Sequence, residues 1–352
     1  MEEKKITIFD VAEKAGVSKG TVDRVLHNRG EVSRKSAEKV RKAIEELNYE
    51  PNLYASLLAS RKNRVIACVL PQYTPGEYWE KIHEGFKAGG ELSASLNVGT
   101  AVFFYDQYDS ESFREACRRM IDSKPSGVVL PPLFKNDAME VAALLKDKEI
   151  PYVYVDTKLE DGNYFAYFGM PMYKSGYLCA SLLTDRCSPS QVDEVLIVRI
   201  RRDKSKQSDP TINRRAGFSD FMDANFPDAK LHTLFIDPSD PASIEATMSA
   251  FFAEHPRIAY VVMFSSRIHL IAKSLAANPC PGRRVIGFDD LEGNIDAVRQ
   301  GHVSILITQH TADQSRLAVS TLTDYILMHK APANRDCYMH MDILTRLNIE
   351  NY

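Results

Sequence analysis

Beyond residue 64, short apolar runs alternate with helix-length amphipathic segments, and this alternation is the strongest constraint on the fold. Such alternation favours parallel sheets joined by right-handed crossovers. Two runs of roughly four to six strands suit two doubly wound lobes better than one very large sheet. The apolar runs predict strands at 65–70, 98–105, 127–131, 151–156, 194–199, 231–236, 258–263, 284–288 and 303–307. Intervening helices are expected, for example, at 77–95, 109–123, 136–148, 171–185, 241–254, 266–277 and 311–329.

The first 50 residues have a different pattern, which predicts three short helices between residues 6 and 48. Thr7, Ser18 and Ser33 each precede one of these helices and are suited to cap it. Ala15 and Gly16 are small and allow close packing at the turn between the first two helices. Short helices joined by such a turn predict a helix-turn-helix, whose second helix enters the major groove of DNA.

Charge is distributed unevenly along the 352 residues. The whole chain carries 44 basic and 47 acidic side chains, a net charge of −3. Residues 1–64 have a net charge of +4, and the remainder has a net charge of −7. A basic head on an acidic body is expected when only one end of a protein meets a polyanion.

Cysteine usage and the start of the chain indicate a cytoplasmic protein. The six cysteines are scattered without a C-x-x-C pair, as expected for reduced structural thiols. The first five residues are charged, and no secretion signal follows them. No apolar run approaches the ~20 residues of a membrane span, so no membrane partner is expected.

The amino-terminal pattern resembles one known family. Thr7–Ser18, followed by Thr21-Val22 and Arg24-Val25-Leu26, is similar to the signature of the lactose-repressor (LacI/GalR) family. The segment 48–52, with Ala55 and Leu58, is similar to the hinge of that family. The resemblance implies a helix-turn-helix domain at 1–50, a hinge helix and linker at 51–64, and an effector-binding and dimerisation domain at 65–352. That body would have the periplasmic-binding-protein-like type I fold, with one lobe at about 65–167 and 309–335 and the other at about 168–308 and 336–352.

The resemblance also assigns DNA-contacting positions. Lys19, Gly20 and Arg24 would face base edges, and Arg24 could fork onto guanine O6 and N7. Asp23 stands where the family usually has a small hydroxyl residue; it either accepts from cytosine or orients Arg24, or it pairs with Arg24 or Lys19. Leu58 aligns with the residue that wedges into the minor groove, although Leu58 could instead pack against the body. Hydroxyl, amide and cationic groups suited to phosphate contacts, or simply to capping and solvation, are Thr7, Ser18, Thr21, Asn28, Arg29 and Ser33. The remaining predicted hinge contacts are Asn52 and Ala55.

A ring of polar and aromatic residues follows the predicted strands of the body. The carboxyl ends of strands are where open α/β sheets bind small molecules. Carboxylate, guanidinium and amide groups there offer the donors and acceptors that vicinal hydroxyls need. Without the resemblance, each would be interpreted as a packing aromatic, a helix cap or a surface charge. The predicted effector-binding residues are Tyr78, Trp79, Asp156, Arg214, Ser265, Asp289 and Gln309.

Two departures from the family pattern affect the effector. Ser265-Ser266 replaces the usual Asn-Asp, and Pro171 stands where Asp or Asn is expected. The set of groups that would read sugar hydroxyls is therefore altered, and a specific sugar does not carry over.

These features predict a sequence-specific transcriptional regulator, expected to be a repressor, whose affinity for operator DNA changes with a small sugar-like effector. A homodimer is expected, because one helix-turn-helix reads only half of a palindromic site. The alternative is a sugar-binding protein without sequence-specific DNA regulation. The sequence has none of the catalytic motifs that would identify an enzyme, and its nine histidines show no metal-binding spacing. No catalytic residue, metal or cofactor is therefore expected.

Overall fold

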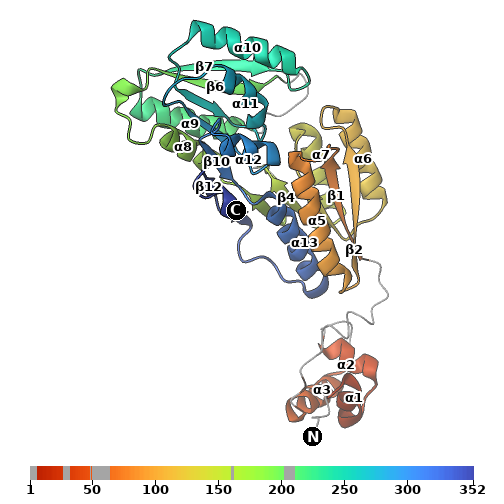
Figure 1. Cartoon of the computed structure of the whole chain (residues 1–352). Coiled ribbons are helices and arrows are strands. Elements are labelled where there is room, and N and C mark those ends of the chain that lie inside the picture. The colour runs from red at the N-terminus through yellow and green to blue at the C-terminus, as the bar shows by residue number, and fades with distance from the viewer. Residues whose placement is uncertain (1–5, 27–31, 48, 50–63, 160–161, 202–210) are drawn as a thin grey trace. The chain divides into compact units, whose positions relative to one another are not determined.

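The structure, a computed structural model, describes residues 6–26, 32–47, 49, 64–159, 162–201 and 211–352 (Figure 1). The chain divides into two compact units, 1–62 and 63–352, each described here by itself. The predicted linker lies outside the described residues except for its last residue, Arg64. The same is true of five predicted DNA contacts, Asn28, Arg29, Asn52, Ala55 and Leu58.

The amino-terminal unit contains the three predicted helices, α1 (Ile8–Ala15), α2 (Lys19–Leu26) and α3 (Arg34–Glu46). Their starts follow the predicted capping pattern. Asp10 accepts a hydrogen bond from the Thr7 backbone N–H at 2.7 Å, while the Ser18 and Ser33 hydroxyls accept from backbone N–H groups three residues onward. A small core joins the three helices and consists of Val11, Ala12, Ala15, Val22, Val40, Ala43 and Tyr49.

Gly16 has a different role from the one expected. It ends α1 with φ of +63°, and a Cβ built on it would meet no atom within 4 Å. Its small size is therefore not needed for close packing. The left-handed backbone, which costs an L-residue about 1 kcal/mol or more, is what requires glycine at this turn.

The sheet of the first lobe has six parallel strands in the order β11-β5-β4-β3-β1-β2. Helices α5 and α13 pack together beside this sheet, and α6 packs against β1, β2 and α7 (Figure 1). The strands are β1 (Arg64–Pro71), β2 (Val98–Tyr105), β3 (Gly127–Leu130), β4 (Tyr152–Asp156), β5 (Ala166–Gly169) and β11 (Asp336–Tyr338). The helices are α5 (Tyr78–Ala94), α6 (Ser110–Asp122), α7 (Lys135–Asp147) and α13 (Thr311–Met328).

The second lobe repeats this plan with the order β12-β10-β9-β8-β6-β7, in which only β12 runs antiparallel. Alternate residues of β6 enter two separate cores: Val195 and Ile197 meet the core that includes α8 and α9, whereas Leu196 and Val198 meet the core that includes α10. The strands are β6 (Glu194–Ile200), β7 (Lys230–Ile236), β8 (Tyr260–Met263), β9 (Arg284–Phe288), β10 (Ile305–Thr308) and β12 (Asp342–Leu344). The helices are α8 (Met172–Leu183), α9 (Ile212–Asn225), α10 (Pro241–Glu254), α11 (Ala272–Ala277) and α12 (Glu292–Arg299).

The predicted architecture of two doubly wound lobes is thus confirmed, and all nine predicted strands are present. The lobe boundaries differ by a few residues from those expected. β5 extends the first lobe through Gly169, and β11 pairs with β5, so 336–338 lies in the first sheet rather than the second. The expected helix at 266–277 begins instead as a 3-10 turn, Ile268–Ile271, before α11.

The cysteines belong to the interior or lie partly buried, and all six are free. Burial raises the pKa of the Cys117 thiol to about 12 and that of Cys68 and Cys179 further, so these groups behave as small apolar side chains. Among the described residues, no helix is long and apolar enough to cross a membrane.

Glycines allow the backbones of two helix pairs to touch, one pair in each lobe. A Cβ on Gly85 of α5 would lie 1.8 Å from the Ala312 carbonyl oxygen of α13. In the second lobe, a Cβ on Gly217 of α9 would lie 2.0 Å from the Tyr173 carbonyl oxygen of α8. These contacts fix the positions of α13 in the first lobe and α9 in the second. They thereby also position the Arg214 side chain, which α9 carries.

We expect Gly85→Ala to destabilise the first lobe by on the order of 3 kcal/mol, because the added methyl meets backbone that cannot rotate away. Urea denaturation followed by the fluorescence of Trp79, the only tryptophan, would measure the loss. Gly99→Ala is the control, since its nearest contact would be an ordinary 3.8 Å. Equal stability of the two variants would show that the helices separate without cost.

Candidate ligand pocket and DNA-reading helix

A pocket of about 90 Å³ lies between the two lobes, at the carboxyl ends of their strands. That volume is several times the ~10–15 Å³ that one water molecule requires. All seven residues predicted to bind an effector line it. The complete lining is Tyr78, Trp79, Gln107, Tyr108, Leu133, Asp156, Met172, Ile200, Thr211, Arg214, Ser265, Ser266, Arg267, Asp289 and Gln309.

The two pocket carboxylates occupy corresponding positions in the two lobes. Asp156 ends β4 and Asp289 directly follows β9, the strand at the same place in the second sheet. Both residues are buried, and both adopt left-handed backbone angles, with φ of 67° and 68°. Non-glycine residues pay roughly 1–3 kcal/mol for such conformations, which concentrate at functional sites.

A chain of buried and partly buried hydrogen bonds connects these carboxylates across the lobes. The Tyr78 hydroxyl donates to Asp156 Oδ1 at 2.5 Å and accepts from Gln309 Nε2 at 3.2 Å. The same Gln309 nitrogen donates to Asp289 Oδ1 at 2.8 Å. Gln314 accepts from the Asp156 backbone N–H at 2.9 Å and donates to the Gln309 carbonyl oxygen, so both lobes share one polar network.

Fully buried side chains hold the two strand ends in place. Asn294 donates to the carbonyl oxygens of Phe288 and Asp289, each at 3.0 Å, and to that of Ser266 at 2.9 Å. In the first lobe, the Tyr167 hydroxyl lies 3.1 Å from the Asp156 carbonyl oxygen. The left-handed turns after β4 and β9 are therefore supported by side chains that do not themselves line the pocket.

Arg214 supplies positive charge to the pocket. It is 4% exposed and its guanidinium lies over the Phe288 ring, 3.9 Å from the centroid. It donates to the Ser175 hydroxyl and the Phe264 carbonyl oxygen, both neutral acceptors. Within the described residues it forms no ion pair, so its charge is available to a polar ligand.

Aromatic rings form part of the wall. Trp79 packs edge-to-face against Tyr78 with centroids 5.1 Å apart, and its indole N–H donates to Gln107 at 3.3 Å. Trp79 is also part of the first lobe's core, so it both packs and lines the pocket. Tyr108, which sequence reasoning missed, lines the pocket and remains half exposed.

Ion pairs between the lobes flank the pocket. Arg267 of the second lobe contacts Glu77, directly before α5 in the first, at 2.8 Å. Lys81 of α5 lies 3.9 Å from Asp290. These pairs are half-buried and add modest attraction between the lobes.

The neighbouring Ser265 hydroxyl is buried and has no hydrogen-bond partner among the described residues, which favours a bound polar group.

Burial controls ionisation in the pocket. Burial raises the pKa of Asp289 to about 7, although Arg214 and the Gln309 hydrogen bond act in the opposite direction. Burial and then the charge of Asp156 raise the pKa of Tyr78, so its hydroxyl keeps the proton that it donates. The pocket therefore combines a carboxyl that titrates near neutrality with a permanently charged guanidinium.

The surface of α2 in the amino-terminal unit presents the residues predicted to read bases. Lys19, Gly20 and Arg24 are exposed, while Val22 of the same helix is fully buried. The Lys19 ammonium lies 4.7 Å from the centroid of the exposed Phe9 ring. This is the arrangement expected of a recognition helix: an apolar face in the core and a cationic face outward.

The predicted phosphate-contacting residues of this unit lie at helix starts. Thr7, Ser18 and Ser33 are exposed, and Thr21 is half-buried with its hydroxyl 3.0 Å from that of Ser18. The capping alternative is therefore correct for Ser18 and Ser33, whose hydroxyls accept from the helix backbone. Capping leaves the exposed hydroxyls able to contact phosphates as well.

Several pocket residues carried no recognisable sequence signal. Met172 is an apolar residue of the predicted helix at 171–185, Ile200 lies just beyond the predicted strand at 194–199, and Thr211 stands at the start of α9. Gln107 and Tyr108 lie in the loop that follows β2. The rule that pocket residues follow parallel strands could have identified that last pair.

Two lobes with a pocket at their strand ends define a two-lobed binding protein, and known families match both units. Residues 66–330 match the model of the periplasmic binding protein domain. Residues 7–52 match the bacterial regulatory proteins of the lacI family. Most of the chain therefore belongs to the periplasmic binding protein domain family, and its amino-terminal segment is a helix-turn-helix domain of the lacI family.

Individual relatives agree with this placement. The HTH-type transcriptional regulator MalR of Streptococcus pneumoniae serotype 4 is 29% identical over 154 residues, 44% of this chain and 46% of the relative. The lactose operon repressor of Escherichia coli K12 is 32% identical over 157 residues, 44% of this chain and 41% of the relative. The chain thus spans about half the length of these curated relatives. A crystal structure of a putative LacI transcriptional regulator from Bacteroides fragilis superposes with a TM-score of 0.77 at 28% identity, covering 83% of this chain and 100% of that chain.

The raised pKa of Asp289 predicts how stability depends on pH. Between about pH 4 and 7 the unfolded chain loses this proton while the folded protein keeps it, so stability falls as pH rises and stays lowered above pH 7. Asp289→Asn keeps the acceptor for Gln309 but cannot ionise. We expect the variant to gain about 2–3 kcal/mol over the parent between pH 5 and pH 8. Thermal melts of both proteins across this range would measure the gain, and a constant difference would contradict it.

Proposed function

We propose that this protein is a sequence-specific DNA-binding transcriptional regulator, acting as a repressor, whose operator affinity is changed by a small sugar-like effector. The observation that carries the proposal is the presence, in one chain, of a lacI-family recognition helix and an interlobe pocket lined by every predicted effector residue. The relatives described above bear the names of transcriptional regulators, which supports a role in regulation rather than catalysis.

The chemistry of the pocket supports a polyhydroxylated ligand. Asp156, Asp289 and Gln309 offer acceptors and donors, and the second oxygen of Asp289 has no hydrogen-bond partner among the described residues. Vicinal hydroxyls match such paired groups, and Arg214 of the second lobe adds donors. Tyr78 and Tyr108 supply rings against which the C–H faces of a sugar can pack.

Coupling between the two functions follows from the lobes. A ligand that binds one interlobe arrangement better than another shifts the population toward it by the difference in affinity. The proposed effector touches both lobes, so it acts on their relative arrangement and thereby on operator affinity, reciprocally. The proposed regulator is a homodimer working in the cytoplasm, where two recognition helices read the halves of one palindromic operator.

Arg24→Ala tests the DNA-reading role. We expect it to weaken binding to the preferred site about ten- to a hundredfold while changing non-specific binding little, because a guanine-reading fork carries sequence discrimination. Footprinting and fluorescence anisotropy with the DNA upstream of the gene would measure both. Lys42→Ala is the matched control, since this exposed lysine of α3 pairs with Glu46. Unchanged site preference in Arg24→Ala would refute the assignment.

Arg214→Ala tests the effector site. Operator binding without effector should persist, whereas the change of affinity caused by an active monosaccharide should disappear, because the pocket loses its guanidinium. Lys174→Ala, an exposed cation on α8, is the control and should respond normally. Binding of a sugar with no sequence-selective DNA affinity would instead favour a sugar-binding protein, and turnover of the sugar would favour an enzyme.

A further inference from the structure

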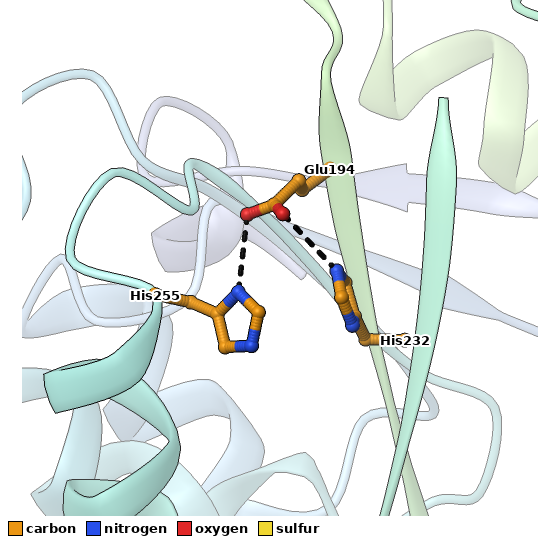
Figure 2. A group of neighbouring side chains, drawn as sticks. All are labelled: Glu194, His232 and His255. Atoms are coloured by element: carbon orange, nitrogen blue, oxygen red, sulfur yellow. Dashed lines mark hydrogen bonds and ion pairs between the residues drawn. The ribbon is translucent and has the colours of Figure 1, made fainter. Parts of the chain in front are cut away.

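Two histidines and a glutamate converge at the edge of the second lobe, outside the effector pocket (Figure 2). Glu194 is the first residue of β6, His232 lies on the edge strand β7, and His255 directly follows α10. One donor atom from each residue lies within 4.8 Å of the other two. Three segments far apart in sequence thus bring nitrogen and carboxylate donors to one point.

The local fold places these side chains on one face of the sheet. His232 is the register partner of Leu196, and Glu194 lies two residues before Leu196 on the same strand, so all three point to the same side. That side is the core containing Leu196 and the buried residues of α10. Because α10 ends above the strand starts, it delivers His255 to the pair.

The donor separations are compatible with a metal centre. His255 Nδ1 lies 3.2 Å from Glu194 Oε2, within hydrogen-bonding distance, and His232 Nε2 lies 3.4 Å from the other carboxylate oxygen, Oε1. Two ligands of a tetrahedral zinc ion, each bound at about 2.0–2.1 Å, are separated by about 3.3 Å.

The state of His232 gives a second, independent indication. Its Nε2 is buried, and the contact with Glu194 does not meet hydrogen-bond geometry, so this nitrogen has no hydrogen-bond partner among the described residues. A buried polar atom left without a partner is uncommon and suggests a missing ion or water. Neutral imidazole nitrogen is the donor that zinc and related metals prefer.

The groups around the three side chains favour the binding of a cation. Phe251 stacks on His255 with centroids 4.5 Å apart and meets His232 edge-on at 5.7 Å, so one ring orients both imidazoles. Burial opposes ionisation of Glu194, but the polar contacts and charges of His255 and His232 outweigh it and lower the pKa of that carboxyl below its usual range. The side chains remain 23–29% exposed, which leaves access for the ion and a water ligand.

We propose that Glu194, His232 and His255 form a binding site for a divalent transition metal ion, Zn²⁺ in the first instance. The ion would join the carboxyl end of α10 to the edge of the sheet. The site lies at the start of β6, whereas Ile200 at the other end of this strand lines the effector pocket, about 20 Å away at 3.3 Å per residue. It is therefore separate from the proposed effector site.

The test is a titration of the full chain, freed of metal by chelation, with Zn²⁺ against a chromophoric competitor. We expect one equivalent to bind, and His232→Ala and His255→Ala each to weaken its affinity at least tenfold, as even loss of an outer-shell partner costs about 10–100-fold. His340→Ala, which removes an exposed histidine elsewhere, is the control and should bind as the parent does. Equal Zn²⁺ affinity in the parent and in His232→Ala would overturn the proposal.

Thermal melts and Co²⁺ spectra distinguish loss of the site from loss of the fold. The variants should melt like the parent without metal, and only the parent and His340→Ala should gain stability when Zn²⁺ is added. Mg²⁺, which prefers oxygen ligands in octahedral geometry, should give no such gain. Co²⁺ in place of Zn²⁺ should show the intense visible absorption of a four-coordinate site, and this absorption should disappear in Glu194→Gln. A stabilisation by Zn²⁺ that persists in both histidine variants would contradict the site.

Discussion

The hydrogen-bond chain from Asp156 through Tyr78 and Gln309 to Asp289 is the constraint on which the body of this protein depends. It joins two carboxylates, one from each lobe, in an environment where an unmatched polar group costs several kilocalories per mole. The lobes must therefore meet in an arrangement that satisfies every member of the chain, or admit a ligand that does so. The proposed effector would take over part of this network, which is how a small molecule could control a much larger structure.

Much of the remaining structure serves to hold that network in position. Repetition of one strand order in both lobes brings the ends of β4 and β9 to opposite walls of the pocket. The left-handed turns there are supported by Asn294 in one lobe and Tyr167 in the other. Backbone contact through Gly85 and Gly217 sets the helices that deliver Gln314 and Arg214. The resulting pocket holds its hydrogen-bonding groups in fixed directions, so hydroxyl groups placed there are recognised by direction as well as by charge.

The sequence predicted the parts of this structure that repeat a simple physical pattern. Four-residue and longer apolar runs marked the nine predicted strands. The rule that ligands lie beyond strand ends, together with the family resemblance, located Asp156, Asp289 and Gln309. The strands β11 and β12 have only three residues each, too few to show the alternation of apolar and polar side chains. The prediction therefore placed 336–338 in the second lobe, whereas β11 belongs to the first sheet. Contacts that depend on tertiary placement, such as Arg267 with Glu77, left no local signal. The role of Gly16 was misread because size and backbone freedom both favour glycine.

The Glu194–His232–His255 cluster shows most clearly where such prediction ends. Metal motifs are recognisable when two ligands share a helix turn or a tight loop, because their spacing then reflects local geometry. Here the ligands are separated by 38 and 23 positions along the chain, distances set by the crossover through α9 and by the strand–helix unit of β7 and α10. Only the register of β6 with β7 and the end of α10 bring them together. Since β6 carries this cluster at one end and pocket residue Ile200 at the other, the second lobe separates a site suited to stabilising the fold from a site suited to sensing. The stability of the second lobe and its response to an effector can then vary independently.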